Sequence, residues 1–176
     1  MPIPCWISAF LRWCWRRPRR SMMLAANSRQ NGGKTMSTWT DINVGEVMIS
    51  LDQTPKTTSR TLLKVALEVM DSKRLGIVCI TGDDGGLQGI ITDGDIRRML
   101  TRVQKPIAAL LSDDVINHAM TSPTTVTKDM SLKEAIGIMG QKQVWDLPVV
   151  TSDGTIEGLL HLHPAIKALM KDFSND

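Results

Sequence analysis

The chain has 176 residues, which is enough for one compact domain or for two small domains that share a core. Its net charge is +3, but residues 1–35 carry seven basic side chains and no acidic one, which leaves −4 for residues 36–176. The larger part of the chain therefore presents no basic surface of the kind that binds nucleic acids.

Residues 1–35 differ in composition from the rest. Tryptophan, cysteine, arginine and proline crowd into the first twenty positions, and the apolar run is too short to span a bilayer. Such a segment could serve as a basic membrane-surface helix or as a mitochondrial-type presequence. We favour a disordered tail or a mis-assigned start, with Met36 as the true first residue.

The first predicted elements run from residue 44 to residue 70. A helical turn is expected over Val44–Met48, followed by a short edge strand over Thr54–Thr58 that begins near a proline. A helix comes next, because apolar residues recur at helical spacing. The predicted apolar stripe consists of Leu62, Val65, Ala66, Val69 and Met70.

A hairpin and a helix complete this unit. The continuous apolar run Leu75–Ile80 predicts a strand covered on both faces, and Leu87–Thr92 returns beside it after the glycine-rich turn Gly82–Gly86. A helix is predicted over Ile96–Leu100, with Asp93 or Asp95 as its cap.

The same series of elements follows a second time. A capping-box pattern beginning at Ser131 opens a helix whose apolar face holds Leu132, Ala135, Ile136 and Met139. The other predicted elements are a turn over Ile116–Met120, a short strand over Ser122–Val126, a hairpin of Val144–Val150 with Ile156–His161, and a helix over Pro164–Met170.

Two similar units thus occupy residues 44–103 and 115–171. Each ends its hairpin in a related phrase, Gly89–Asp95 in the first and Gly158–Pro164 in the second. A unit too small to bury its own core stacks on its copy, so we expect a cleft between the two units and the function in that cleft.

This β-α-β-β-α unit, occurring twice and carrying Gly-x-x-Thr-x-x-Asp after its third strand, resembles a cystathionine-β-synthase (CBS) domain pair. The resemblance implies an α/β fold in which two repeats form a pseudo-two-fold Bateman module. The phrases Gly89–Arg98, Met120–Pro123 and Gly158–His163 are more narrowly similar to the C-terminal half of bacterial arabinose-5-phosphate isomerases. Those isomerases carry their chemistry in a sugar-isomerase (SIS) domain, for which 35 preceding residues leave no room. The resemblance implies the regulatory half without the catalyst.

Thr92 and Asp95 are the strongest candidate ligand residues. Both residues lie where a predicted strand ends and a predicted helix begins. The Thr92 hydroxyl and the first N–H groups of the helix can bind a phosphate there. The Asp95 carboxylate can accept hydrogen bonds from a ribose diol. Asp93 lies in the same turn. The resemblance implies the same roles for Thr92 and Asp95 and places backbone near Thr57 against the base. The alternative is that Asp95 only caps the helix.

The second unit departs from this pattern, because His161 replaces the threonine and Pro164 the aspartate. One site, built mainly on the first unit, is expected. His161 and His163 alternate along the chain and would share a face, where they could line the cleft and meet an anionic sugar. Two histidines do not complete a zinc site, so no metal is predicted.

Three further residues invite weaker interpretations. Arg97 and Arg98 point about 100° apart on a helix, so we expect one near the cleft and the other in solvent. Trp145 is interpreted as a core or dimer contact rather than a stacking platform.

Two functions remain. The first is a module that senses a nucleotide or nucleotide-sugar, of the adenine nucleotide or cytidine monophosphate-Kdo class implied by the resemblance, Kdo being the eight-carbon sugar made from arabinose 5-phosphate. The second is a ligand-free dimerisation module. No catalytic constellation can be assembled, so the chain alone is not predicted to be an enzyme. A homodimer is expected, a SIS-type isomerase domain is a candidate partner, and the odd number of cysteines favours a reducing, cytoplasmic setting.

Overall fold

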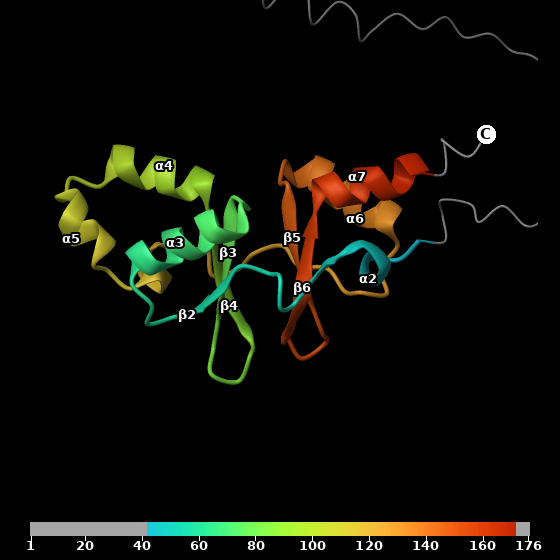
Figure 1. The fold of residues 1–176 in the computed structure, drawn as a ribbon, viewed down its shortest axis with the longest axis horizontal. Helices are drawn as coiled ribbons and strands as arrows, with labels where there is room; N and C mark the ends of the chain where they lie inside the picture. Colours follow the sequence, from blue (N-terminus) through green and yellow to red (C-terminus); the bar gives the residue numbers. More distant parts are fainter. Residues whose placement is uncertain (1–41, 172–176) are drawn as a thin grey trace, which may run out of the picture. The chain divides into compact units, whose positions relative to one another are not determined.

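The computed structural model describes residues 42–171, so the prediction for residues 1–35 lies outside the described part of the chain. Two units of strands and helices stand beside each other (Figure 1). In chain order the elements are α2 (Val44–Val47), β1 (Ile49–Ser50), β2 (Lys56–Thr58), α3 (Leu63–Lys73), β3 (Ile77–Thr81), β4 (Leu87–Thr92), α4 (Asp93–Arg102), α5 (Ile107–Leu111), the 3-10 helix η1 (Val115–His118), α6 (Leu132–Lys142), β5 (Asp146–Val150), β6 (Ile156–His161) and α7 (Leu162–Lys171).

Each unit is built on a three-stranded sheet. In the first, β2 runs parallel to β3, and β3 forms an antiparallel hairpin with β4. In the second, β5 and β6 form the hairpin and β1 pairs antiparallel with β6. The predicted hairpins are confirmed, and β4 and β6 have the predicted bounds. The turns of the two hairpins touch, since Leu87 donates its N–H to the carbonyl of Gly154.

The predicted strand over Ser122–Val126 is wrong. Only Val126 bridges to β5, through bonds with Pro148 and Val150. Extending this parallel ladder to Thr124 would require an N–H from Pro148, which proline lacks. The first unit has no proline at the matching position of β3, and β2 forms there.

The units exchange their leading segments. The core of the second unit contains Val44 of α2, whereas the core of the first contains Leu110 and Val115 from the connection between units. In Figure 1 the N-terminal helix α2 accordingly lies with α6 and α7. The sequence places α2 next to the first unit, but its apolar side chains are buried in the second. Each unit therefore depends on the other for part of its core.

The apolar stripe predicted for α3 is confirmed at Ala66 and Met70, which are buried, and at Val69, which packs against the same core, but it is wrong at Leu62 and Val65. Leu62 and Val65 are 44% and 40% exposed, while the buried residues are Leu63, Ala66 and Met70. Leu62 precedes the helix in extended conformation and bridges to Asp114, so the helix begins one residue later than the stripe assumed. In α6 the prediction is confirmed, with Leu132, Ala135 and Met139 buried and Ile136 packed against them.

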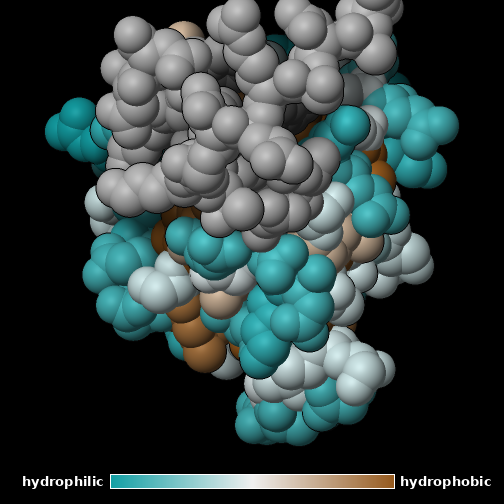
Figure 2. Space-filling view, turned by 90° about the vertical axis from the view of Figure 1, so that its right-hand side faces the viewer, coloured by the Kyte–Doolittle hydropathy of each residue, from teal (hydrophilic) through white to brown (hydrophobic). Residues whose placement is uncertain are grey.

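Figure 2 shows one face of the molecule, on which hydrophilic residues dominate the coloured surface, hydrophobic ones form narrow strips, and the lower edge ranges from white to hydrophilic. Among residues 42–171 there is no helix long and apolar enough to cross a membrane.

Candidate functional site

A cavity of about 680 Å³ lies between the two units. One wall is the junction of β4 and α4, and the facing wall is the junction of α6 and β5. The lining residues are Gly76, Ile77, Ile90, Thr92–Asp95, Arg97, Arg98, Met120, Thr124, Lys142–Leu147 and His161. The repeat pattern predicted such a cleft.

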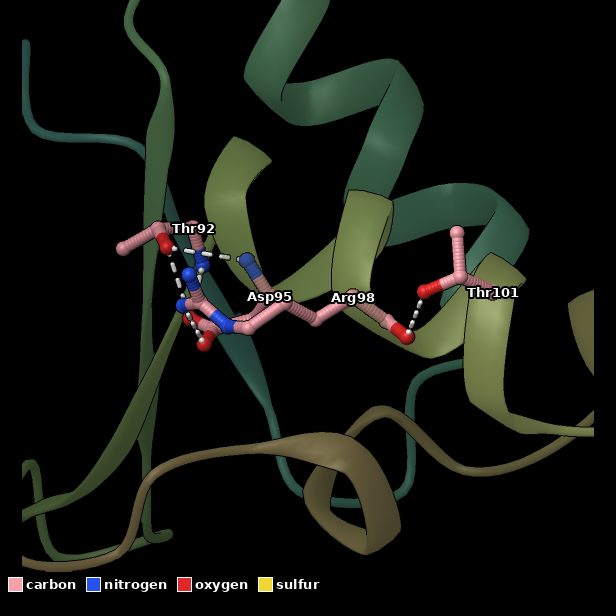
Figure 3. Close-up of polar contacts among 4 residues, drawn as sticks. All are labelled: Thr92, Asp95, Arg98 and Thr101. Carbon is pink, nitrogen blue, oxygen red and sulfur yellow. Dashed lines mark hydrogen bonds and ion pairs between the residues drawn. The ribbon is translucent and has the colours of Figure 1, made fainter. Parts of the chain in front are cut away.

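A reciprocal capping box closes the β4–α4 junction. Thr92 is the N-cap, and its Oγ1 accepts from the N–H of Asp95 at 3.3 Å. Asp95 Oδ2 accepts in turn from the N–H of Thr92 at 3.0 Å and from its hydroxyl at 2.6 Å (Figure 3). The predicted cap is thus corrected: Asp93 does not cap the helix, and Asp95 completes the box from the third helical position.

The second oxygen of Asp95 accepts from Arg98, with 2.6 Å between Oδ1 and Nη2. Burial acts to raise the pKa of Asp95, but the hydrogen bonds from Thr92 and Arg98 outweigh it and hold the pKa below its usual value. The carboxylate is therefore charged at neutral pH. Its side chain remains 20% exposed, so a ligand hydroxyl can reach it.

Asp93 contacts Gly76, the residue that precedes β3. Its N–H donates to the carbonyl of Gly76 at 3.0 Å, and a Cβ on Gly76 would stand 2.7 Å from Asp93 Oδ2. The absence of a side chain at Gly76 leaves the space that the Asp93 carboxylate occupies.

In the second unit the equivalent strand position holds a hydrogen-bonded pair of a histidine and an aspartate. The register sets Thr92 opposite Ile77 in one hairpin and His161 opposite Asp146 in the other. His161 Nδ1 and Asp146 Oδ1 are 2.8 Å apart. Burial raises the pKa of Asp146, a hydrogen bond and the charge of His161 partly oppose the rise, and the charge of Asp93 adds to it.

Asp146 was missed by the sequence reasoning. A signal was present, because an aspartate opens an otherwise apolar strand, and counting back from the turn at Asp153–Gly154 sets it opposite His161. The motif shared by the two units covers only the third strand and the start of the following helix, so Asp146 lies outside it.

Replacing Asp146 with Asn should make stability less dependent on pH. The folded-state pKa of Asp146 is raised, so the folded chain binds this proton more tightly than the unfolded chain, and the free energy of unfolding falls as pH rises through that interval. Asn keeps the shape without the titration. We expect the variant to gain stability relative to wild type in urea titrations as pH rises above the unfolded value of 3.8, until the folded-state carboxyl of the wild type has lost its proton.

Asp153→Asn is the matched control, because hydrogen bonds from Thr151 and Thr155 lower the pKa of this exposed carboxyl. Its difference from wild type should change with pH in the opposite direction. A difference for Asp146→Asn that is constant or falls with rising pH would show that burial does not dominate at this carboxyl.

The cavity brings together four of the six predicted ligand residues. Thr92, Asp93, Asp95 and His161 line it, whereas Thr57 and His163 are not among its lining residues. The Thr57 carbonyl accepts from Thr81 within the first sheet. Thr124, in the corresponding segment of the second unit, lines the cavity in its place.

The ring of His163 lies nearly parallel to that of His161, with centroids 6.3 Å apart. Within residues 42–171 no three His, Cys, Asp or Glu side chains are grouped to hold a metal ion.

Basic and aromatic side chains also line the cavity. Arg97 and Arg98 both do so, which corrects the expectation that one would lie away from the cleft. Trp145 is 68% exposed and lines the cavity, so it is not a core residue. With Lys142, three basic groups face three carboxylates around this space.

Comparison with known proteins agrees with this architecture. The model of the CBS domain family matches residues 44–102 and 112–171. An arabinose 5-phosphate isomerase, KdsD of Pseudomonas aeruginosa, is 32% identical over 128 residues, covering 72% of this chain and 38% of the isomerase. The matched region spans about a third of the length of the curated relatives, from 27% to 38%.

Solved structures share the fold. The complex of CBSX2 with AMP superposes with a TM-score of 0.66 at 24% identity, covering 74% of this chain and 97% of CBSX2. A second structure is the CBS domain pair of protein MJ0100 with 5′-methylthioadenosine and S-adenosyl-L-methionine, with a TM-score of 0.60, 19% identity and coverage of 73% and 95%. The predicted α/β fold, a tandem CBS pair forming a Bateman module, is confirmed. The chain belongs to the CBS domain family and carries two of these domains in tandem.

Proposed function

We propose that the chain is a regulatory module that binds a nucleotide or nucleotide-sugar in the cavity between its two CBS domains. The observation that carries this proposal is the placing of the charged Asp95 carboxylate and three basic side chains around one cavity that both domains line. A nucleotide carries a ribose diol, which a carboxylate can bind, and a phosphate anion, which basic side chains can bind.

Asp95 would accept hydrogen bonds from the ribose hydroxyls. Its Oδ2 is held by Thr92, whereas Oδ1 is held by Arg98, whose side chain is half-exposed. A carboxylate offers about four acceptor sites, so ribose can add to Oδ1 or displace Arg98 from it.

The phosphate would be bound by basic side chains rather than by the helix terminus alone. At the start of α4, the N–H groups of Asp93 and Asp95 already have partners, and both carboxylates repel an anion. Arg97, Arg98 and Lys142 supply positive charge at the same cavity. An Arg98 displaced by ribose would become available to the phosphate.

The second domain would not form an equivalent site. His161 holds Asp146, and Pro164 takes the place of the ribose acceptor. Here His161 would line the first site, and His163 would lie behind it at the start of α7.

The ligand would act by joining the two domains. A ligand in the cavity would contact both walls and would therefore stabilise the conformation in which the two domains lie at this distance. It would change the activity of a partner only through its different affinities for two conformations of the module. The partner we propose is a SIS-type sugar-phosphate isomerase domain, since KdsD is matched over only 38% of its length. We assign no reaction to this chain alone. The buried Cys79 thiol fits a reducing, cytoplasmic setting.

A second candidate function is assembly without a ligand. It is supported by the closed hydrogen-bonding of Thr92, Asp95 and Arg98, and by apolar side chains exposed on α5 and α7, namely Ile107, Ile166 and Met170. Those side chains would also serve a homodimer of a ligand-binding module.

A thermal-shift screen of the full chain tests the proposal. The compounds are AMP, ATP, CMP, cytidine monophosphate-Kdo and arabinose 5-phosphate. A ligand present at one hundred times its dissociation constant should add about 2.7 kcal/mol to the free energy of unfolding. The absence of any shift from a cooperatively folded protein would contradict ligand sensing and favour assembly.

A further inference from the structure

We infer that Trp145 is the platform on which the nucleobase of the ligand stacks, so that the base is bound by the second domain and the ribose by the first. This inference rests on the proposed function and adds to it the residue that recognises the base.

Exposure singles out this side chain. Trp145 is 68% exposed although it directly precedes β5, a strand whose last four residues are buried. Its backbone is held in place, because its carbonyl accepts from the N–H of Leu162 at 2.9 Å. A large aromatic surface is thus presented to solvent from a fixed strand end. Leaving an indole in water forgoes the free energy of burying it, and a ligand that covers it recovers that free energy.

The other parts of a nucleotide have partners elsewhere in the cavity. The ribose is assigned to Asp95 and the phosphate to the basic side chains, so the base must pack against an apolar or aromatic surface among the remaining lining residues. Trp145 is the one aromatic residue other than His161 among those lining the cavity. His161 is held by Asp146, whereas most of Trp145 is exposed.

The charges around the cavity favour a neutral ring over a cation on this indole. Three carboxylates and three basic groups line the space, so their formal charges sum to zero and the lining has no excess of negative charge that would favour a cation on the ring. A nucleobase is neutral and flat, and stacking on an aromatic side chain tolerates any base. Gln143, two residues before Trp145, also lines the cavity and carries an amide that can donate to and accept from the edge of a base.

The test uses the full chain with AMP, CMP and ribose 5-phosphate, measured by titration calorimetry. In Trp145→Ala the affinity for AMP should fall by roughly 5- to 150-fold, the range that corresponds to one stacked base. Ribose 5-phosphate has no base, so its affinity should be unchanged. Trp145→Phe should retain most of the AMP affinity because an aromatic face remains.

A fluorescence measurement separates stacking from a structural role. AMP should quench wild-type tryptophan emission, and this quenching should disappear in Trp145→Phe while calorimetry still reports binding. Leu100→Ala is the control, since Leu100 is 51% exposed on α4 and does not line the cavity. This variant should bind AMP as the wild type does.

The failures are distinguishable. If wild type binds AMP or CMP and Trp145→Ala binds it equally well, this inference is overturned and the proposed function stands. If wild type binds none of the three compounds, the proposed nucleotide site is overturned and the platform with it.

Discussion

Asp95→Ala is expected to abolish the nucleotide-induced gain in stability while leaving the chain folded. Hydrogen bonds to a charged group contribute about 1.5–3 kcal/mol each, and a ribose diol makes two of them, so the affinity should fall by about 100-fold or more. At a concentration that gives wild type about 2.7 kcal/mol, the variant would then gain about 0.4 kcal/mol. Thermal shift and calorimetry with AMP both measure this difference.

The same substitution also removes half of the capping box at the start of α4. Loss of a cap costs about 0.5–2 kcal/mol, so the unliganded variant should be less stable than wild type. The contribution of Asp95 to the free energy of unfolding also depends on pH. Its folded-state pKa is lowered, so its contribution is present above the unfolded value of 3.8 and is lost as pH falls through the folded value. Binding must therefore be compared at one neutral pH.

Ser131→Ala separates the two effects. Ser131 caps α6 by accepting from the N–H of Glu134 at 3.2 Å, as Thr92 accepts from Asp95 on α4, and it does not line the cavity. This control should lose similar intrinsic stability and keep the full ligand response. If Asp95→Ala also kept the full response, Asp95 would be a helix cap and the diol would be bound elsewhere.

The elements that the sequence predicted well are those defined by local pattern. Strands β4 and β6 follow from apolar runs between turn residues, and the buried face of α6 follows from helical spacing. The capping box of α4 is also local, because its bonds join residues three apart, although the sequence analysis expected Asp93 or Asp95 and not Thr92 as the N-cap. In each case the information lies within about ten neighbouring residues.

The features that were missed depend on contacts between distant segments. Strand β1 pairs with β6, more than a hundred residues later, and no local pattern indicates that the two units exchange their leading segments. For the same reason Thr124 rather than Thr57 reaches the cavity. Trp145 was interpreted as a core or dimer contact, but it lies just before the first residue of β5 and is 68% exposed, which excludes a core position.

The exchange of segments makes one glycine critical. Gly158 in β6 lies opposite Ser50 of β1, and a Cβ at Gly158 would stand 2.4 Å from the carbonyl oxygen of Ile49 and 3.2 Å from Met48 Sδ. The first of these atoms is backbone and cannot turn aside. Gly158→Ala must therefore separate β1 from β6 or displace β6 from β5. We expect the free energy of unfolding to fall by about 3 kcal/mol or more.

Gly140→Ala is the matched control within the same domain. Gly140 lies exposed on α6, and a Cβ there would have no neighbouring atom within 4 Å, so this change should raise stability by about 0.5–1 kcal/mol. Urea unfolding followed by circular dichroism measures both variants. If Gly158→Ala releases only α2 and β1, the folded state buries less surface. Both the urea concentration at the midpoint and the slope of the free energy of unfolding against urea concentration should then fall. If Gly158→Ala stays within about 0.5 kcal/mol of wild type, β1 does not pack against β6 this closely, and the shared core would rest on α2 alone.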